Sequence, residues 1–158
     1  MLNLKNTTLV TIDGVSENEM HLKALKYSCQ NILFGEVKYF SFKNHGKSDF
    51  YEFIEIPKLT YDQYNNFCLV KLKDYIQTDY VIIVQDDGFI IHPDKWLEDF
   101  QAYDYIGAPW PKEHMFHNTK RWPFVHNKLI ESERKYHVGN GGFCMRTKKL
   151  VDYFKISS

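Results

Sequence analysis

Two adjacent carboxylates at the end of an apolar run are the residues of this sequence with the clearest chemical potential. Residues 81–84 read Val-Ile-Ile-Val, and after Gln85 the chain continues as Asp86-Asp87-Gly88. Carboxylate oxygens suit Mg²⁺ or Mn²⁺, and an ion held by one or two carboxylates keeps positions open for phosphate oxygens. Such an ion can neutralise a departing diphosphate. The alternative is an Asp-Gly turn whose side chains only cap local backbone groups, and the residues leave both interpretations open.

The apolar run that leads to these carboxylates is expected to be a central strand. Its residues do not alternate between apolar and polar types, whereas a half-exposed hairpin arm should alternate. Upstream, residues 9–12 form a β-rich run that closes at Asp13-Gly14. Ser16 and Glu19 then match a capping box, which predicts a helix over residues 16–31.

The remaining elements continue this alternation of strand and helix. Strands are expected over residues 36–42, 105–108 and 143–146, and an irregular stretch over 111–135. Helices are expected over 60–77, where Thr60 and Gln63 match a capping box, over 94–100 with Asp94 as N-cap, and over 147–154. The pattern predicts one α/β domain over residues 1–158, with helices on both faces of the sheet. Ligands of such sheets bind at the carboxyl ends of the strands, where Thr11 and Asp13 fall together with the two carboxylates.

Composition excludes some classes of protein. Twenty Lys and Arg balance twenty Asp and Glu, without a basic run, which argues against a nucleic-acid partner. Cys29, Cys68 and Cys144 are odd in number and far apart, as expected of reduced core residues in the cytoplasm. The N-terminus does not resemble a signal peptide, and no apolar run reaches membrane-spanning length. We therefore expect a soluble cytoplasmic protein, with peripheral attachment to a membrane through a partner left open.

Several motifs occur together in the second half of the chain. They are Gln-Asp-Asp-Gly-Phe at 85–89, a Pro-x-x-Trp step at 93–96, Tyr-Asp-Tyr-Ile-Gly-Ala-Pro-Trp at 103–110, and Gly-Asn-Gly-Gly-Phe-Cys-Met-Arg at 139–146. In their order and spacing, over about residues 55 to 155, the chain resembles an uncharacterised glycosyltransferase-like family. The resemblance implies a GT-A-like (Rossmann-like) nucleotide-diphospho-sugar transferase sheet. In that fold an Asp-x-Asp motif at the end of a central strand binds a metal and the donor diphosphate.

The chain departs from the Asp-x-Asp metal motif of that fold. Gln85 stands at the first position of Asp-x-Asp, so only Asp87 aligns with the second, and Asp86 is the candidate substitute. The resemblance thus implies Mn²⁺ or Mg²⁺ at Asp87 and Asp86, bound weakly or lost if Asp86 does not substitute. It also implies nucleotide contacts at Thr11 and Asp13, for which an ordinary Asp-Gly turn is the alternative. The family pattern continues through further acidic residues, so we expect a minimal or C-terminally short version.

Five further residues are candidates for binding the sugar or the acceptor. Gly141 and Gly142 permit close backbone approach, and Asn140 offers an amide to sugar hydroxyls, although an ordinary turn before a strand explains all three. Trp110 is suited to stacking on a ring, but a buried aromatic is the default. Asp104 is a polar residue within an apolar motif, and a surface or backbone-capping role is the alternative.

The predicted function is transfer of a sugar from a nucleotide donor, such as a UDP-sugar, to an acceptor hydroxyl in surface polysaccharide or glycan assembly. The sequence names no general base for this reaction. A non-catalytic carbohydrate- or nucleotide-binding module with a degenerate site is the rival hypothesis, which Gln85 favours. Nucleotidyl transfer ranks last, because no Gly-rich basic loop follows the first strand.

Overall fold

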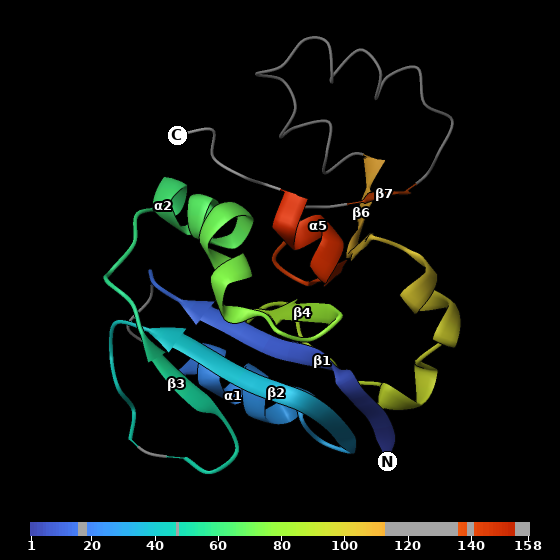
Figure 1. Ribbon diagram of the computed structural model, residues 1–158, viewed down its shortest axis with the longest axis horizontal. Coiled ribbons are helices and arrows are strands. Elements are labelled where there is room, and N and C mark those ends of the chain that lie inside the picture. The colour runs from blue at the N-terminus through green and yellow to red at the C-terminus, as the bar shows by residue number, and fades with distance from the viewer. Residues whose placement is uncertain (16–18, 47, 113–135, 139–140, 154–158) are drawn as a thin grey trace, which may run out of the picture.

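A six-stranded mixed sheet forms the centre of the protein (Figure 1). The structure is a computed structural model that describes residues 1–15, 19–46, 48–112, 136–138 and 141–153. The strand order is β3-β2-β1-β4-β8-β5, and a separate two-stranded sheet pairs β6 with β7. β1 is parallel to both β2 and β4, and β2 is parallel to β3, whereas β8 runs antiparallel to β4 and to β5.

The described elements have the following bounds. The strands are β1 (Leu2–Asp13), β2 (Ile32–Ser41), β3 (Glu52–Glu55), β4 (Tyr80–Val84), β5 (Tyr105–Gly107), β6 (Pro109–Pro111), β7 (Tyr136–Val138) and β8 (Cys144–Thr147). The helices are α1 (Met20–Ser28), α2 (Tyr61–Asn66) and α5 (Lys148–Tyr153), with a π turn η1 (Phe67–Lys71) and the 3₁₀ turns η2 (Leu72–Tyr75), η3 (Pro93–Lys95) and η4 (Glu98–Ala102).

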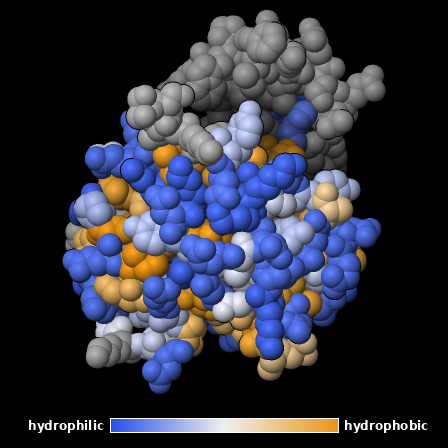
Figure 2. Space-filling model, in the orientation of Figure 1, coloured by the Kyte–Doolittle hydropathy of each residue, from blue (hydrophilic) through white to orange (hydrophobic). Residues whose placement is uncertain are grey.

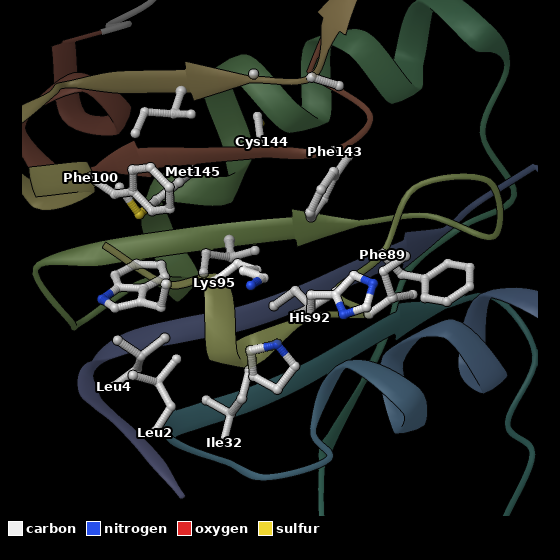
Figure 3. A pocket seen from close by; sticks show the side chains of 18 of the residues that line it. Leu2, Leu4, Ile32, Phe89, His92, Lys95, Phe100, Phe143, Cys144 and Met145 are labelled. Carbon is white, nitrogen blue, oxygen red and sulfur yellow. The ribbon is translucent and has the colours of Figure 1, made fainter. Parts of the chain in front are cut away.

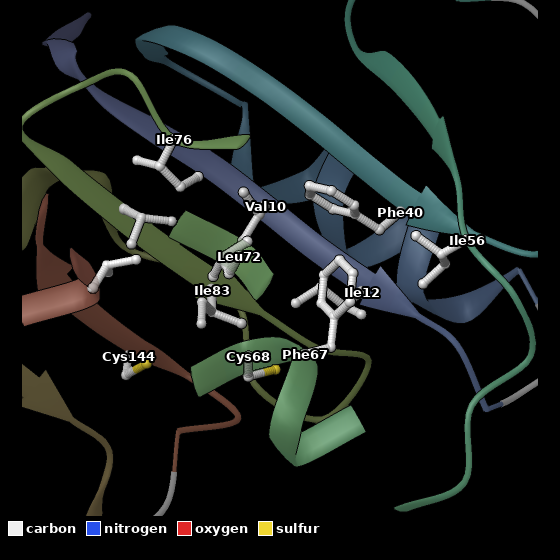
Figure 4. Close-up of a cluster of buried hydrophobic side chains, with 12 residues drawn as sticks. Val10, Ile12, Phe40, Ile56, Phe67, Cys68, Leu72, Ile76, Ile83 and Cys144 are labelled. Carbon is white, nitrogen blue, oxygen red and sulfur yellow. The ribbon is translucent and has the colours of Figure 1, made fainter. Parts of the chain in front are cut away.

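Helices cover both faces of the sheet. Figure 1 shows α1 on one face and α2 with α5 on the other. On the α2 face, Phe67 and Leu72 pack on Val10 and Ile83, and Figure 4 shows this cluster. On the α1 face, Leu25 belongs to a second buried cluster. The mixed α/β class and the covered sheet predicted from the sequence are confirmed.

The direction in which the chain adds strands to the sheet changes between β1 and β4, although these two strands are parallel to each other. From β1 the chain moves outward through β2 to β3, and then returns to the other side of β1 as β4. Where two neighbouring strands lead to crossovers on opposite faces, their carboxyl ends leave a crevice that commonly binds ligands. β1 ends at Asp13 and β4 ends at Val84, so the residues that follow them meet at this crevice.

The central strand and one helix start confirm their predictions in detail. Residues 81–84 are at most 4% exposed, as expected of a strand between two neighbours and under helices on both faces. The Thr60 side chain accepts a hydrogen bond from the Gln63 amide, and the Gln63 side chain accepts one from the Thr60 amide. This reciprocal pair is the capping box that the sequence predicted.

Several element boundaries differ from the predictions. α1 begins at Met20 with Glu19 as N-cap and without a side-chain cap hydrogen bond, while Ser16 lies outside the described residues. The prediction of Asp94 as an N-cap is wrong, because His92 takes that position and Pro93 begins the turn. Pro93 suits the first helical position, since the backbone N–H that it lacks has no intrahelical acceptor there.

Three strands were missed. β3 is only four residues long, and β6 and β7 have three each, so none is long enough to show a period of two. β6 also carries two prolines, a residue type that argues against a strand and is tolerated only at edges.

Among the described residues, no helix is long and apolar enough to cross a bilayer. Figure 2 shows a mostly hydrophilic face on which apolar side chains form small scattered groups.

Candidate functional site

The two adjacent carboxylates occupy the middle of a tight turn after β4. The Gln85 amide donates to the Gly88 carbonyl at 2.9 Å, and the Gly88 amide donates back to the Gln85 carbonyl at 3.2 Å. Asp86 and Asp87 are therefore the two central residues, and we call residues 85–88 the acidic turn. The Asp86 side chain is 38% exposed and Asp87 is also exposed, so both carboxylates are accessible to a solvent-borne ligand.

The end of β1 lies beside this turn. The Thr11 hydroxyl donates to the carbonyl of Val84 at 2.8 Å, which ties the two strands together just before the acidic turn. Thr11 is fully buried, so it acts on the site through this strand contact. Asp13 is 1% exposed and accepts a hydrogen bond from the Tyr39 hydroxyl at 3.1 Å. The end of β1 thus adds a buried carboxylate, that of Asp13, near the exposed pair Asp86 and Asp87.

His21 connects the two strand ends. Its Nδ1 atom lies 3.9 Å from an Asp13 carboxylate oxygen, and its Nε2 atom lies 3.7 Å from an Asp86 carboxylate oxygen. The imidazole comes from the first turn of α1 and is 12% exposed. His21 was not predicted from the sequence, because no local pattern marks a histidine within the helix expected over residues 16–31 as part of a site.

Gln85 faces away from this carboxylate group. Its side-chain amide donates to the Tyr64 hydroxyl on α2. Burial raises the pKa of Tyr64, so this hydroxyl stays protonated over the ordinary pH range. Gln85 therefore anchors the acidic turn to the α2 face.

The glycine-rich segment before β8 touches the acidic turn. A Cβ atom on Gly88 would lie 2.7 Å from the Phe143 Cβ atom, so the two segments meet without room for a side chain. β8 and β4 pair antiparallel with Ile83 opposite Cys144, which places the residues just before β8 next to the residues just after β4. The fold thus brings the motif at 85–89 and the motif at 139–146 together.

Gly141 has a packing role within this segment. A Cβ atom there would lie 2.3 Å from Nη2 of Arg146, a buried side chain whose Nη1 donates to the Cys68 carbonyl at 2.9 Å. Gly141 also accepts a hydrogen bond from the Cys144 thiol through its carbonyl. The absence of a side chain at Gly141 therefore makes space for a guanidinium.

The other residues predicted to bind substrate do not all lie near the acidic turn. Gly142 directly precedes Phe143, which touches the acidic turn, whereas Asn140 falls outside the described residues. Trp110 is half-buried in β6, opposite His137 of β7, just beyond the end of β5.

Asp104 lies at the opposite end of the sheet. It precedes Tyr105, which pairs with Arg146, and Arg146 pairs in turn with Val81 at the beginning of β4. The Thr147 hydroxyl donates to the Asp104 carboxylate at 2.8 Å. The structure therefore does not bring Asp104 together with the acidic turn.

The donor set suits a divalent ion that is completed by its ligand. Within the described ranges, no group of three or more His, Cys, Asp or Glu side chains is arranged to hold a metal. Asp86 and Asp87 offer hard oxygen atoms at an exposed turn, and Mg²⁺ is commonly held by one or two carboxylates together with substrate phosphates. The residues fit an ion that binds with a diphosphate, and they do not form a closed metal cage.

Comparison with known proteins identifies the family. The sequence profile of DUF5672, described as a protein of unknown function, matches residues 50–155, so the chain belongs to the DUF5672 family. The matched range includes the acidic turn and the segment before β8, and it begins after β1, α1 and β2. The curated proteins that were searched give no match to the chain.

Proposed function

We propose that this chain is a GT-A-like, metal-dependent glycosyltransferase. It transfers a sugar from a nucleotide-diphospho-sugar, such as a UDP-sugar, to an acceptor hydroxyl in the assembly of a surface polysaccharide or another glycan. The observation that carries the proposal is the meeting of Asp13, His21 and Asp86 at the crevice between β1 and β4. A crevice of this kind is the usual ligand site of a sheet with this reversal of strand order.

The acidic turn would hold Mn²⁺ or Mg²⁺ together with the donor diphosphate. When bound, the ion supplies positive charge that stabilises the diphosphate as its bond to the sugar breaks. Asp86 and Asp87 contribute the carboxylate oxygens, and the two backbone hydrogen bonds across the turn fix their direction before the ligand arrives. His21 lies between Asp13 and Asp86 and would orient the Asp86 carboxylate. The Tyr39 hydroxyl in turn donates a hydrogen bond to Asp13.

The other side of the crevice would receive the sugar. Gly142 directly precedes Phe143, which touches the acidic turn, at a point where a donor sugar attached to the diphosphate would extend. Trp110 stands beyond the end of β5 and is half-buried, which leaves part of its ring accessible for stacking on a sugar.

Donor turnover tests the proposal. The purified chain is incubated with UDP-glucose, UDP-galactose, UDP-N-acetylglucosamine and GDP-mannose in the presence of Mn²⁺, and released UDP or GDP is measured. We expect slow release from at least one donor, its loss on addition of EDTA, and at least a tenfold reduction in the Asp87→Asn variant.

A non-catalytic binding module is the second candidate, and Gln85 favours it. This residue stands at the first carboxylate position of the Asp-x-Asp motif of GT-A-like folds, and its side chain donates a hydrogen bond to Tyr64 on the other face of the sheet. Metal-dependent binding of a nucleotide without release from any donor would support the module and would contradict the transferase.

A further inference from the structure

A large apolar cavity lies beside the proposed site and is not used by it. It is a pocket of about 400 Å³, open to solvent on one side, on the α1 face of the sheet between β4 and the segment that follows the acidic turn. Figure 3 shows Leu4 and Ile32 on one side of β4, with Phe100 and Met145 on the other. Apart from the Trp96 indole nitrogen and the Cys144 thiol, only His92 and Lys95 bring polar side-chain groups to its lining, and these side chains are 67% and 79% exposed.

The size and lining of this cavity define the class of its ligand. Protein interiors are close-packed and leave few voids larger than a water molecule. Ligand pockets range from about 300 to 1,000 Å³ and are lined mainly by apolar side chains, which favour apolar groups of the ligand. A cavity of about 400 Å³ with this lining therefore fits a hydrocarbon group and disfavours a free sugar or a nucleotide.

The cavity adjoins the acidic turn through shared residues. Phe89 lines the cavity and directly follows Gly88, and Phe143 lines it while touching Gly88. The Phe143 carbonyl also accepts a hydrogen bond from the amide of Ala108, another lining residue. A ligand in the cavity would therefore lie next to the proposed donor site.

We propose that this cavity binds the hydrocarbon tail of a lipid-type glycosyl acceptor. This inference rests on the proposed function, because it makes the tail part of the molecule that receives the sugar. The exposed ends of His92 and Lys95 lie at the rim, where a hydrated polar head is compatible with them. An alkyl chain and an isoprenoid chain share the required chemistry.

Binding of alkyl glucosides tests the proposal directly. Butyl, hexyl and octyl β-D-glucoside, each below its micelle concentration, are titrated into the native chain and followed by calorimetry. We expect affinity to rise about fourfold for each added methylene, the equivalent of ~0.8 kcal/mol per buried group, and glucose alone not to bind. Geranyl β-D-glucoside is compared with decyl β-D-glucoside, which has the same number of carbon atoms in its tail, and tighter binding of one or the other assigns the tail as isoprenoid or alkyl.

Two matched variants distinguish binding in the cavity from non-specific binding to exposed apolar side chains. Ile91 lines the cavity and is 57% exposed, whereas Leu97 is 58% exposed and is not part of the lining. Since both are accessible, a glutamate at either position should leave the fold intact, which circular dichroism checks. Ile91→Glu should weaken octyl glucoside at least fivefold, and Leu97→Glu should leave its affinity unchanged.

The outcomes distinguish this proposal from the one on which it rests. Absence of octyl glucoside binding, affinity independent of chain length, or equal loss in both variants would overturn the acceptor-tail site. If nucleotide and Mn²⁺ still bound, the proposed donor site would stand. Tail binding without any nucleotide binding would leave an apolar-ligand cavity and overturn its connection to glycosyl transfer.

Discussion

Gly88 and Phe143 touch so closely that a Cβ atom on the glycine would lie 2.7 Å from the Cβ atom of the phenylalanine. This contact joins the turn after the central strand to the segment before β8, although Gly88 and Phe143 lie more than fifty positions apart in the chain. It also forms the boundary between the acidic turn and the apolar cavity, since Phe143 lines that cavity. The position of the two carboxylates therefore depends on a glycine.

Gly88→Ala should displace the acidic turn. Because the added methyl group meets backbone-proximal atoms that cannot rotate away, we expect a loss of about 1 to 3 kcal/mol in the free energy of unfolding. Urea denaturation measures the loss. In a Phe143→Gly background the same substitution should cost less than half as much, and an unchanged cost in that background would refute the contact.

Gly141→Ala should act through Arg146. The methyl group would press on Nη2 of the buried guanidinium and weaken its hydrogen bond to Cys68, so we expect a stability loss of about 1 to 3 kcal/mol. An Arg146→Lys background, which removes that nitrogen, should reduce the loss. If Gly141 instead served only the donor, Gly141→Ala would keep native stability while losing nucleotide affinity.

Thr60→Ala should remove the cap of α2. The hydroxyl satisfies the Gln63 amide, and loss of such a cap costs about 1 kcal/mol. Thr60→Ser keeps the acceptor oxygen and is the control, with a free energy of unfolding close to that of the native chain. Equal destabilisation by alanine and serine would show that the methyl group, rather than the cap, is what matters.

The Cys29 thiol should make stability fall at high pH. Burial raises the pKa of Cys29 from 9.0 to about 11, so between these values the unfolded chain loses a proton that the folded chain retains. The stabilising contribution is complete below pH 9 and is lost as the pH rises toward 11. Relative to Cys29→Ala, the native chain should lose on the order of 1 to 2 kcal/mol in urea unfolding, less than the full shift implies because the thiol is partly exposed. A native chain and variant with parallel pH profiles would contradict this.

The parts of the fold predicted from sequence are those with strong local signals. The unbroken apolar run of β4 and the Thr60 capping box each depend on neighbouring residues, so their type and position were predictable. β3 could not be predicted in this way, because its four residues are held by pairing with β2 and alternate only weakly. The strand β8 was predicted, but its antiparallel direction was not, since direction depends on the path of the chain through space.

The candidate site was predictable only in part for the same reason. Asp13 and Asp86 were expected at strand ends, and the fold places them at one crevice through His21, whose role no local pattern announced. Asp104 was a candidate for the same site because of its place in the motif at 103–110. The register of β5 on β8 puts it at the other end of the sheet. Membership of a motif therefore did not determine proximity.

Metal-dependent nucleotide binding tests the central claim most directly. Thermal unfolding is followed with UDP or GDP, with and without Mn²⁺, for the native chain, for Asp86→Asn/Asp87→Asn, and for Asp104→Asn as a control that removes a carboxylate at the opposite end of the sheet. A ligand at one hundred times its Kd stabilises the folded state by about 2.7 kcal/mol. We predict a clear rise in Tm with nucleotide and Mn²⁺ together, little with either alone, its loss in the double variant and its retention in Asp104→Asn. Absence of any shift in the folded native chain, or a shift that the double variant retains, would contradict a diphosphate site at the acidic turn.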